Sequence, residues 1–176
     1  EFAAMTDGYY VLMNDITIEE HTPVAEFNGT LNGGGHQIVI RKYIDGENTG
    51  LFMKIGSNGV VKHLSIESNI NITSEELMNA GLLAAESEGE IYHVRVSGTF
   101  DVAVDNWGGH ELNAGFVAVN RGEIRKITST LDITASNRAN VNAGGAAGRS
   151  YMDITQSMFT GDVTTVAGSG YFARAG

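Results

Sequence analysis

Six basic side chains recur at matching positions of a sequence repeat, and they are the first candidates for chemistry. They are Lys62, His63, His93, Arg95, Arg125 and Lys126. His63 and His93 hold the same place in successive repeats, a place continued by Lys126 and Gln156. If the repeats stack, these positions form a basic stripe that attracts an anionic partner, and the two imidazoles come close enough to share a metal ion. A solvated polar face, offset by neighbouring acids, is the simpler interpretation of the same pattern.

A zinc-protease motif is the second candidate, at His110 and Glu111. Such a site needs His-Glu-x-x-His, with two ligands one helical turn apart and a catalytic Glu. The segment reads His110-Glu111-Leu112-Asn113-Ala114, so the second His is missing. We therefore predict no metal site and no cofactor in this chain.

The only tryptophan, Trp107, lies in the longest insertion between repeats, residues 105–112. An exposed Trp in a loop can stack on a sugar or anchor a protein partner. The other interpretation is that Trp107 folds back onto its own repeat. With the basic stripe, this loop yields the predicted partner-binding set: Trp107, His110, Arg95, Arg125 and Lys126.

Paired carboxylates would indicate a polysaccharide lyase or glycosidase. The chain has 21 acidic and 11 basic residues and a net charge of −10. Asp101, Asp105 and Glu111 surround the Trp107 loop, yet none of the acids falls into a compact pair in the repeat register. We predict a solvated acidic surface without catalytic residues. The same net charge argues against nucleic acid as a partner, because phosphate is repelled.

These residues are positioned by a repeat of about 30 residues, which is typical of a solenoid. Its marker is Asn-x-Gly, whose glycines are 31, 34 and 29 residues apart. When such units stack, matching side chains form columns, and the marker asparagines form an amide ladder at a corner. The predicted ladder is Asn48, Asn79, Asn113 and Asn142.

Alternating apolar residues rich in Ile and Val predict three short strands in each unit. We therefore expect an all-β fold, a right-handed parallel β-helix of about five rungs, with a short helical cap remnant over Glu1–Met5. The chain is expected to be a single domain and a fragment of a longer protein. Its predicted units are a degenerate capping rung at 1–47, then repeats at 48–78, 79–112, 113–141 and 142–168, and a partial repeat at 169–176.

Several segments resemble the GLUG repeat of bacterial surface proteins. Residues 81–98 carry Gly-Leu-Leu-Ala, Glu-Gly-Glu-Ile and Val-Ser-Gly, and the stretch from Phe27 to Ile38 is similar to the lead-in of such proteins. The chain departs from the repeat where Ala84 and Ala118 replace a usual Gly. The resemblance extends to adhesin-like proteins and to the N-terminal region of IgA-specific metalloendopeptidases. It implies a secreted or cell-surface location and a parent whose active site lies outside this segment.

The expected function is therefore a non-catalytic extracellular scaffold or adhesion module, with a host protein or glycan as partner. A carbohydrate-active β-helix is the alternative from a different class. No run of 18 apolar residues occurs, so no membrane insertion is expected. Because a solenoid cut within a rung exposes strand edges, we also expect end-to-end self-association of the fragment.

Overall fold

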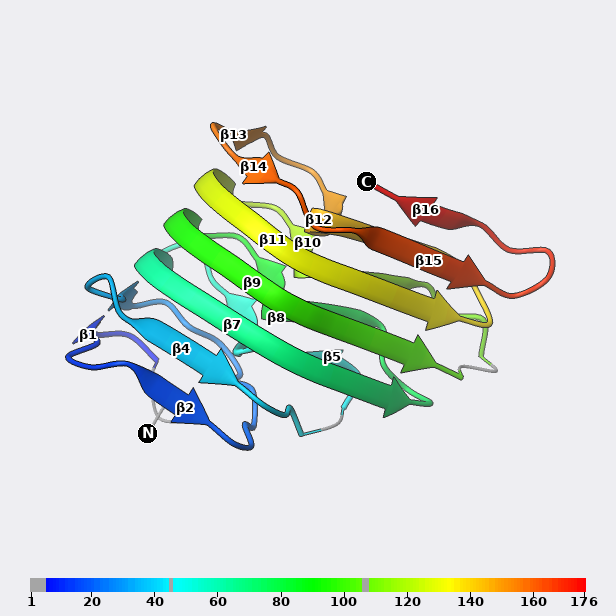
Figure 1. The fold of residues 1–176 in the computed structure, drawn as a ribbon, viewed down its shortest axis with the longest axis horizontal. Coiled ribbons are helices and arrows are strands. Elements are labelled where there is room, and N and C mark those ends of the chain that lie inside the picture. The colour runs from blue at the N-terminus through cyan, green and yellow to red at the C-terminus, as the bar shows by residue number, and fades with distance from the viewer. Residues whose placement is uncertain (1–5, 45, 106–107) are drawn as a thin grey trace.

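The chain is a parallel β-solenoid of about five turns, which confirms the predicted β-helix (Figure 1). The computed structural model describes residues 6–44, 46–105 and 108–176, and all regular structure in these ranges is strand. The helical remnant expected over Glu1–Met5 lies outside the described residues.

Two parallel sheets form the walls of the solenoid. The larger sheet contains β1 (Tyr9–Val11), β2 (Ile16–Ile18), β3 (Thr30–Asn32), β4 (Gln37–Ile40), β7 (Val60–Ser74), β9 (Glu90–Val104), β11 (Glu123–Asn137), β13 (Ile154–Thr155), β14 (Met158–Phe159) and β15 (Val163–Ala167). The smaller sheet contains β5 (Asn48–Thr49), β6 (Phe52–Ile55), β8 (Asn79–Ser87), β10 (Leu112–Asn120), β12 (Val141–Ser150) and β16 (Ala173–Ala175).

The second and third strands expected in each rung are joined in β7, β9 and β11. Each of these strands has 15 residues, and they pair with one another in register along most of their length. In the next layer, three shorter strands, β13, β14 and β15, take the place of one long strand and pair with successive parts of β11. The long strands therefore form a continuous wall that bends within each rung.

Residues 9–40 supply two further layers before β7. The pair β1 and β2 lies on the pair β3 and β4, and both β3 and β4 pair with β7. β3 and β4 flank a glycine turn at residues 33–35. This end of the solenoid thus continues the larger sheet with short strands.

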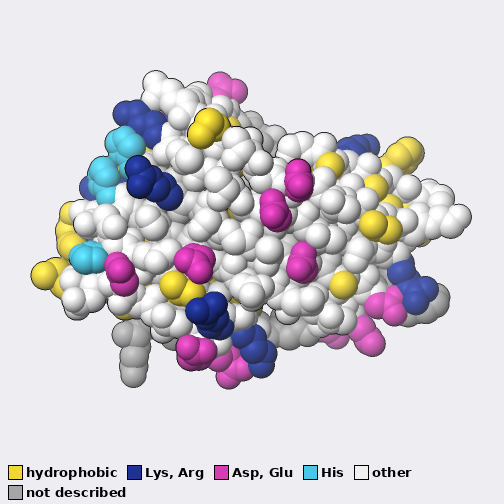
Figure 2. All heavy atoms as spheres, in the orientation of Figure 1, with side chains coloured by type: hydrophobic (Ala, Val, Ile, Leu, Met, Phe, Trp, Pro, Cys, Tyr) yellow, Lys and Arg dark blue, Asp and Glu magenta, His cyan; other side chains and the backbone are white. Residues whose placement is uncertain are grey.

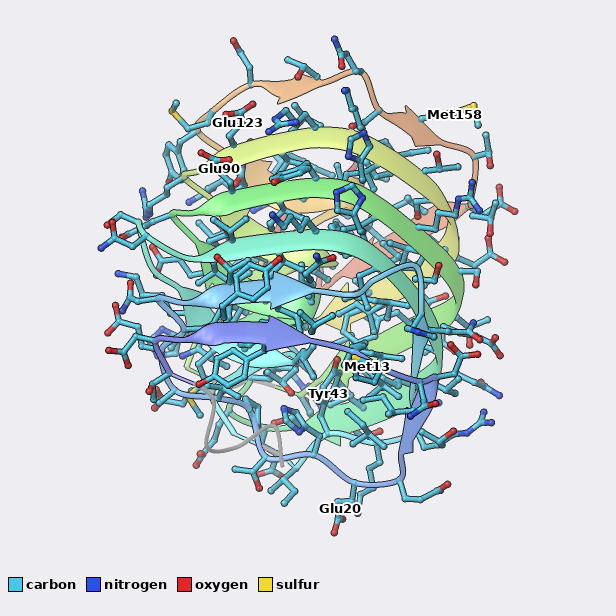
Figure 3. The ribbon with its side chains drawn as sticks, turned by 90° about the vertical axis from the view of Figure 1, so that its left-hand side faces the viewer. Met13, Glu20, Tyr43, Glu90, Glu123 and Met158 are labelled. Atoms are coloured by element: carbon cyan, nitrogen blue, oxygen red, sulfur yellow. The ribbon has the colours of Figure 1, made fainter. Side chains whose placement is uncertain are left out.

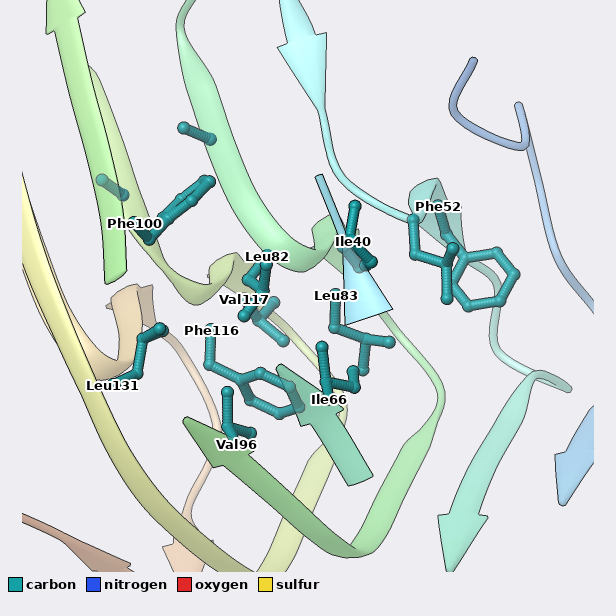
Figure 4. Close-up of a cluster of buried hydrophobic side chains, with 14 of the residues drawn as sticks. Ile40, Phe52, Ile66, Leu82, Leu83, Val96, Phe100, Phe116, Val117 and Leu131 are labelled. Carbon is teal, nitrogen blue, oxygen red and sulfur yellow. The ribbon is translucent and has the colours of Figure 1, made fainter. Parts of the chain in front are cut away.

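Matching apolar side chains stack along the interior. Val61, Ile91 and Ile124 are fully buried and aligned in the pairing register, and the partly buried Ile154 continues the column. Larger side chains from both sheets fill the centre, where Phe100, Phe116 and Leu82 lie together (Figure 4). Burial of these columns supplies the apolar core that a single rung cannot form.

The marker asparagines form a hydrogen-bonded ladder at the start of the smaller sheet. Asn79 Nδ2 donates to Asn48 Oδ1 at 2.8 Å, and Asn113 Nδ2 donates to Asn79 Oδ1 at 2.9 Å. Asn142 Nδ2 donates to Asn113 Oδ1 at 3.1 Å, and Arg174 donates to Asn142 Oδ1 at 3.3 Å. Asn79, Asn113 and Asn142 therefore each use both the acceptor and the donor of the amide along the solenoid axis.

His21 is a buried ionisable group near the N-terminal layers. Its Nε2 donates to the Leu51 carbonyl oxygen at 2.9 Å, and its ring meets that of Tyr43 edge-on at 6.1 Å. Burial lowers the pKa of His21 below its usual 6.5, an effect the Leu51 hydrogen bond partly opposes. The folded state therefore holds His21 mainly neutral.

We expect the free energy of unfolding to fall as the pH drops below 6.5. The unfolded chain binds a proton at His21 more readily than the folded chain, so acid favours unfolding until the lowered pKa is passed. Urea unfolding at about pH 7.5 and about pH 5.5 measures this change. The variant His21→Gln should show a smaller fall, with a remainder from the exposed His93, whose pKa is also lowered. An equal fall in both proteins would show that His21 does not contribute.

Candidate functional site: a cationic groove at the strand bend

The bend in each long strand is made by a residue in the left-handed backbone region. Among the residues that the structure describes, four non-glycine residues have this conformation: His63 (φ 52°), His93 (φ 53°), Lys126 (φ 55°) and Gln156 (φ 52°). Gly34 and Gly35, with φ of 61° and 87°, hold the turn between β3 and β4. The left-handed region costs a residue with a Cβ roughly 1–2 kcal/mol, so four such residues in one column are unusual.

A groove with a volume of about 870 Å³ runs along this column. Its walls come from five successive layers: Asn32, Gly34, Gly35, His63, Leu64, Ser65, His93, Val94, Arg95, Lys126, Thr128 and Gln156. Histidine and Lys or Arg side chains gather at the corresponding edge of the molecule, at the left of the view (Figure 2). The long strands stack above one another when that edge is seen face-on (Figure 3).

Aromatic rings line one side of the bend. The His63 and His93 rings stack with centroids 4.9 Å apart and an interplanar angle of 22°. Tyr92 meets both of them edge-on, at 5.9 Å and 5.6 Å. Lys62 Nζ lies 5.9 Å from the Tyr92 ring centroid, and the Arg125 guanidinium lies 4.0 Å from it. These cation–π contacts hold two more positive charges beside the groove.

No carboxylate is among the groove-lining residues of the described chain. Arg125 is offset by Glu123 at 2.8 Å and Glu90 at 3.8 Å, acids placed at the starts of β11 and β9 (Figure 3). Arg95 and Lys126, both exposed, take part in no ion pair with a described residue. The site is thus positively charged within a chain of net charge −10.

The like charges at the bend influence one another. The pKa of His93 is lowered, first by desolvation and then by the charges of Lys126, His63 and Arg125. A protonated His93 would therefore be repelled by its positively charged neighbours. An anion placed between these groups removes that repulsion.

The structure brings together only part of the predicted partner-binding set. Arg95 and Lys126 line the groove, and Arg125 lies beside it over Tyr92. His110 is exposed between β9 and β10 and does not line the groove. Trp107 lies outside the described residues.

Sequence reasoning identified Gln156 as a member of the column but did not identify three other polar residues of the groove. Asn32, Ser65 and Thr128 add hydroxyl and amide groups to its walls beside the Gln156 amide. The available signal was the two-residue gap in Val61-x-x-Leu64. Two consecutive positions between inward-facing residues interrupt the strand alternation, and an extra outward residue must occupy the bend.

Metal-binding geometry does not develop at either candidate position. No cluster of three His, Cys, Asp or Glu side chains occurs among the residues the structure describes. Glu111 accepts from Asn142 Nδ2 at 2.5 Å and pairs with Arg149 at 2.7 Å, so its carboxylate supports the ladder. Beside the stacked His63 and His93, the described part of the chain places no third ligand of these types.

A second hollow, with a volume of about 520 Å³, is acidic. It is lined by Gly46, Thr73, Ser74, Glu75, Glu76 and Asp105. Arg138 donates to both carboxylate oxygens of Asp105, which offsets that charge. The Glu75 and Glu76 side chains are exposed.

The fold and the groove together define a class: a parallel β-solenoid with a cationic groove along its axis. Comparison with protein-family models, curated proteins and solved structures finds no match for this chain. Among the described residues, no helix is long and apolar enough to cross a membrane.

Proposed function

We propose that this chain is a non-catalytic binding and display module of a larger secreted or cell-surface bacterial protein. The observation that carries the proposal is the groove, whose lining combines cationic and neutral polar groups and no carboxylate. Such a surface can hold a ligand, whereas glycoside hydrolysis generally requires a carboxylate pair. The GLUG resemblance supports the same role, with a host protein or glycan as partner and any protease active site elsewhere in an IgA-protease-like parent.

Display also fits the mechanics of the solenoid. Its rungs are joined by long parallel strands and by the amide ladder, so groups on successive rungs keep a fixed spacing of roughly 4.8 Å. A ligand that contacts several rungs meets a preorganised surface and loses less binding free energy to ordering of the protein.

A carbohydrate-active enzyme is the second candidate, and the acidic hollow is the observation that favours it. Glu75 and Glu76 are its exposed acids, and Asp105 is the third. If this hollow is catalytic, a double change Glu75→Gln with Glu76→Gln should abolish turnover. The pairing of Asp105 with Arg138 argues against an acid–base couple there.

Binding without turnover is the expected result for the purified chain. We would apply it to an array of host glycans and host proteins, and incubate it with soluble polysaccharides while following new reducing ends and unsaturated products. Binding to at least one array component with no shortening of any polysaccharide supports a display module. Shortening that disappears in the Glu75/Glu76 double variant would overturn the proposal and establish the enzyme.

A further inference from the structure

We propose that the groove binds a linear acidic polysaccharide, laid along the solenoid axis, through Arg95, Lys126 and the His63–His93 stack. The inference rests on the proposed function and specifies the ligand of the same surface. Carboxylate or sulfate groups of the chain would pair with the cations, and its hydroxyls would bond to the neutral polar groups of the walls.

The backbone at the bend is the first line of argument. Gly or Asn tolerates the left-handed region best, yet three of the four strained positions carry His63, His93 and Lys126. Residues held in sparsely populated conformations point to a function for their side chains. Here the strain sets three positive or protonatable groups in one column, facing one groove.

The charge distribution is the second line. Arg95 and Lys126 carry charges that no described carboxylate offsets, although acids outnumber bases in the chain. Desolvation, and then repulsion from Lys126, His63 and Arg125, already disfavours the protonated form of His93. An incoming anion is therefore attracted by the site and favours protonation of His93.

The shape of the groove selects a linear ligand. Its lining comes from five layers, which extends the contact over roughly 20 Å at a rung spacing of about 4.8 Å. That spacing is close to the length of one sugar ring along an extended chain, so successive sugars can meet successive rungs. The side chains of Asn32, Ser65, Thr128 and Gln156 supply the donors and acceptors that a polyhydroxylated chain needs.

Other polyanions fit the groove less well. Single-stranded nucleic acid binds by stacking its bases on aromatic side chains, and the two aromatic rings of the lining, His63 and His93, stack on each other. An acidic peptide that extends a sheet needs a free strand edge, whereas β7, β9 and β11 are paired on both sides in this region.

Titration calorimetry with the purified chain tests the proposal. The probes are heparin fragments for sulfate, polygalacturonate for carboxylate, dextran as a neutral glycan, oligothymidylate and poly-glutamate. We expect heparin or polygalacturonate to bind, with an affinity that falls with added salt because the charges are screened. Lowering the pH below 6.5 should strengthen binding, because protonation of His93, whose pKa is lowered beside His63, Lys62, Tyr92, Arg95, Arg125 and Lys126, adds a positive charge to the groove.

Two variants locate the site. Lys126→Asn removes a charge and keeps a residue that tolerates the left-handed backbone, and Arg95→Gln removes the other unpaired charge. Each should weaken binding about tenfold, the effect of one charge-assisted hydrogen bond. Lys42→Gln is the control, because Lys42 is an exposed base that does not line the groove. Its Nζ pairs with Glu20 Oε1 at a distance of 2.7 Å. The control should change affinity less than about twofold. Thermal unfolding of all three variants should match the parent.

Several outcomes overturn the assignment. If Lys42→Gln weakens binding as much as the two groove variants do, the groove is not the binding site. If dextran binds as tightly as the acidic polysaccharides, the positive charge of the groove does not select the ligand. Equal binding of oligothymidylate or poly-glutamate would reduce the site to a general polyanion surface. Absence of binding by both acidic polysaccharides would reject the ligand class alone, since the array and turnover measurements decide the display function separately.

Discussion

Replacing Gly81 by alanine is expected to lower the free energy of unfolding by about 3 kcal/mol, because the added methyl group would overlap the backbone. A Cβ at Gly81 would lie 1.7 Å from the Ala84 carbonyl oxygen and 2.3 Å from its carbon. Both are backbone atoms of β8 itself, at the point where its pairing register shifts, so no flexible side chain can move aside. The clash must be relieved by shifting a strand that is paired along both of its edges, with β10 on one side and with β5 and β6 on the other.

The same constraint recurs at the other marker glycines. A Cβ at Gly144 would approach the Ala147 carbonyl oxygen to 2.2 Å, and one at Gly115 would approach the Gly144 oxygen to 2.7 Å. Each corner of the smaller sheet folds its chain tightly against its own backbone and the next rung. The requirement is therefore close approach, and only glycine meets it without displacement.

Urea unfolding followed by far-ultraviolet circular dichroism measures the effect. Gly46→Ala is the matched control, because the nearest atom to a Cβ there is the Asn48 carbonyl oxygen at 3.9 Å. This control should unfold within about 0.5 kcal/mol of the parent. If Gly81→Ala and the Gly46→Ala control have the same free energy of unfolding, the corner relaxes at low cost and the close-approach explanation fails.

The corners and the ladder were predictable because each depends on one residue type: glycine allows the close backbone approach at a corner, and asparagine can both donate and accept in the ladder. The spacing of Asn-x-Gly places an amide and a glycine at the same point of every rung, and stacking then aligns them. The Val61, Ile91 and Ile124 column follows from the same register. In a solenoid, sequence spacing translates directly into neighbourhood in space, so local patterns are enough.

The groove was harder to foresee, because it depends on the shape of the backbone. The sequence pattern placed His63, His93 and Lys126 in one outward column, and its two-residue gap indicated an extra outward residue, but it did not indicate the left-handed backbone that hollows the surface beside them. Positive φ is uncommon for any residue with a Cβ, and even for His, which is enriched there, the residue type alone does not predict it. The contribution of Asn32 required the register between layers of different length.

The predicted partner-binding set combined two places that the fold separates. Arg95 and Lys126 come early in the long strands, at the bend, while His110 follows the far end of β9. Proximity in sequence to the Trp107 loop was the basis for including His110. In a solenoid, residues lie close together when they occupy the same position in successive rungs. His110 occupies a different position in its rung from the groove residues.

The Asn113→Ala variant should cost about 2–3 kcal/mol of unfolding free energy, because it cuts the amide ladder at an interior rung. Asn113 is 8% exposed, donates to Asn79 Oδ1 at 2.9 Å and accepts from Asn142 Nδ2 at 3.1 Å. Alanine takes away the donor that Asn79 Oδ1 has in the ladder. Asn142 Nδ2 keeps the Glu111 carboxylate as acceptor, so the loss falls mainly on the Asn79 side.

An aspartate at this position separates hydrogen bonding from packing. Asn113→Asp preserves shape but presents only acceptors when ionised, so it opposes Asn79 Oδ1 and adds a charge beside Glu111. Its stability should be lowest at neutral pH and recover partly in acid, where a protonated carboxyl can donate to Asn79. Chemical unfolding at both pH values compares it with Asn69→Ala, an exposed amide that accepts from Thr99 at 3.0 Å and should change stability by less than about 0.5 kcal/mol. Equal stability of Asn113→Asp and the parent at neutral pH would mean that the amides fill space at the corner and that their directional bonds do not stabilise the stack.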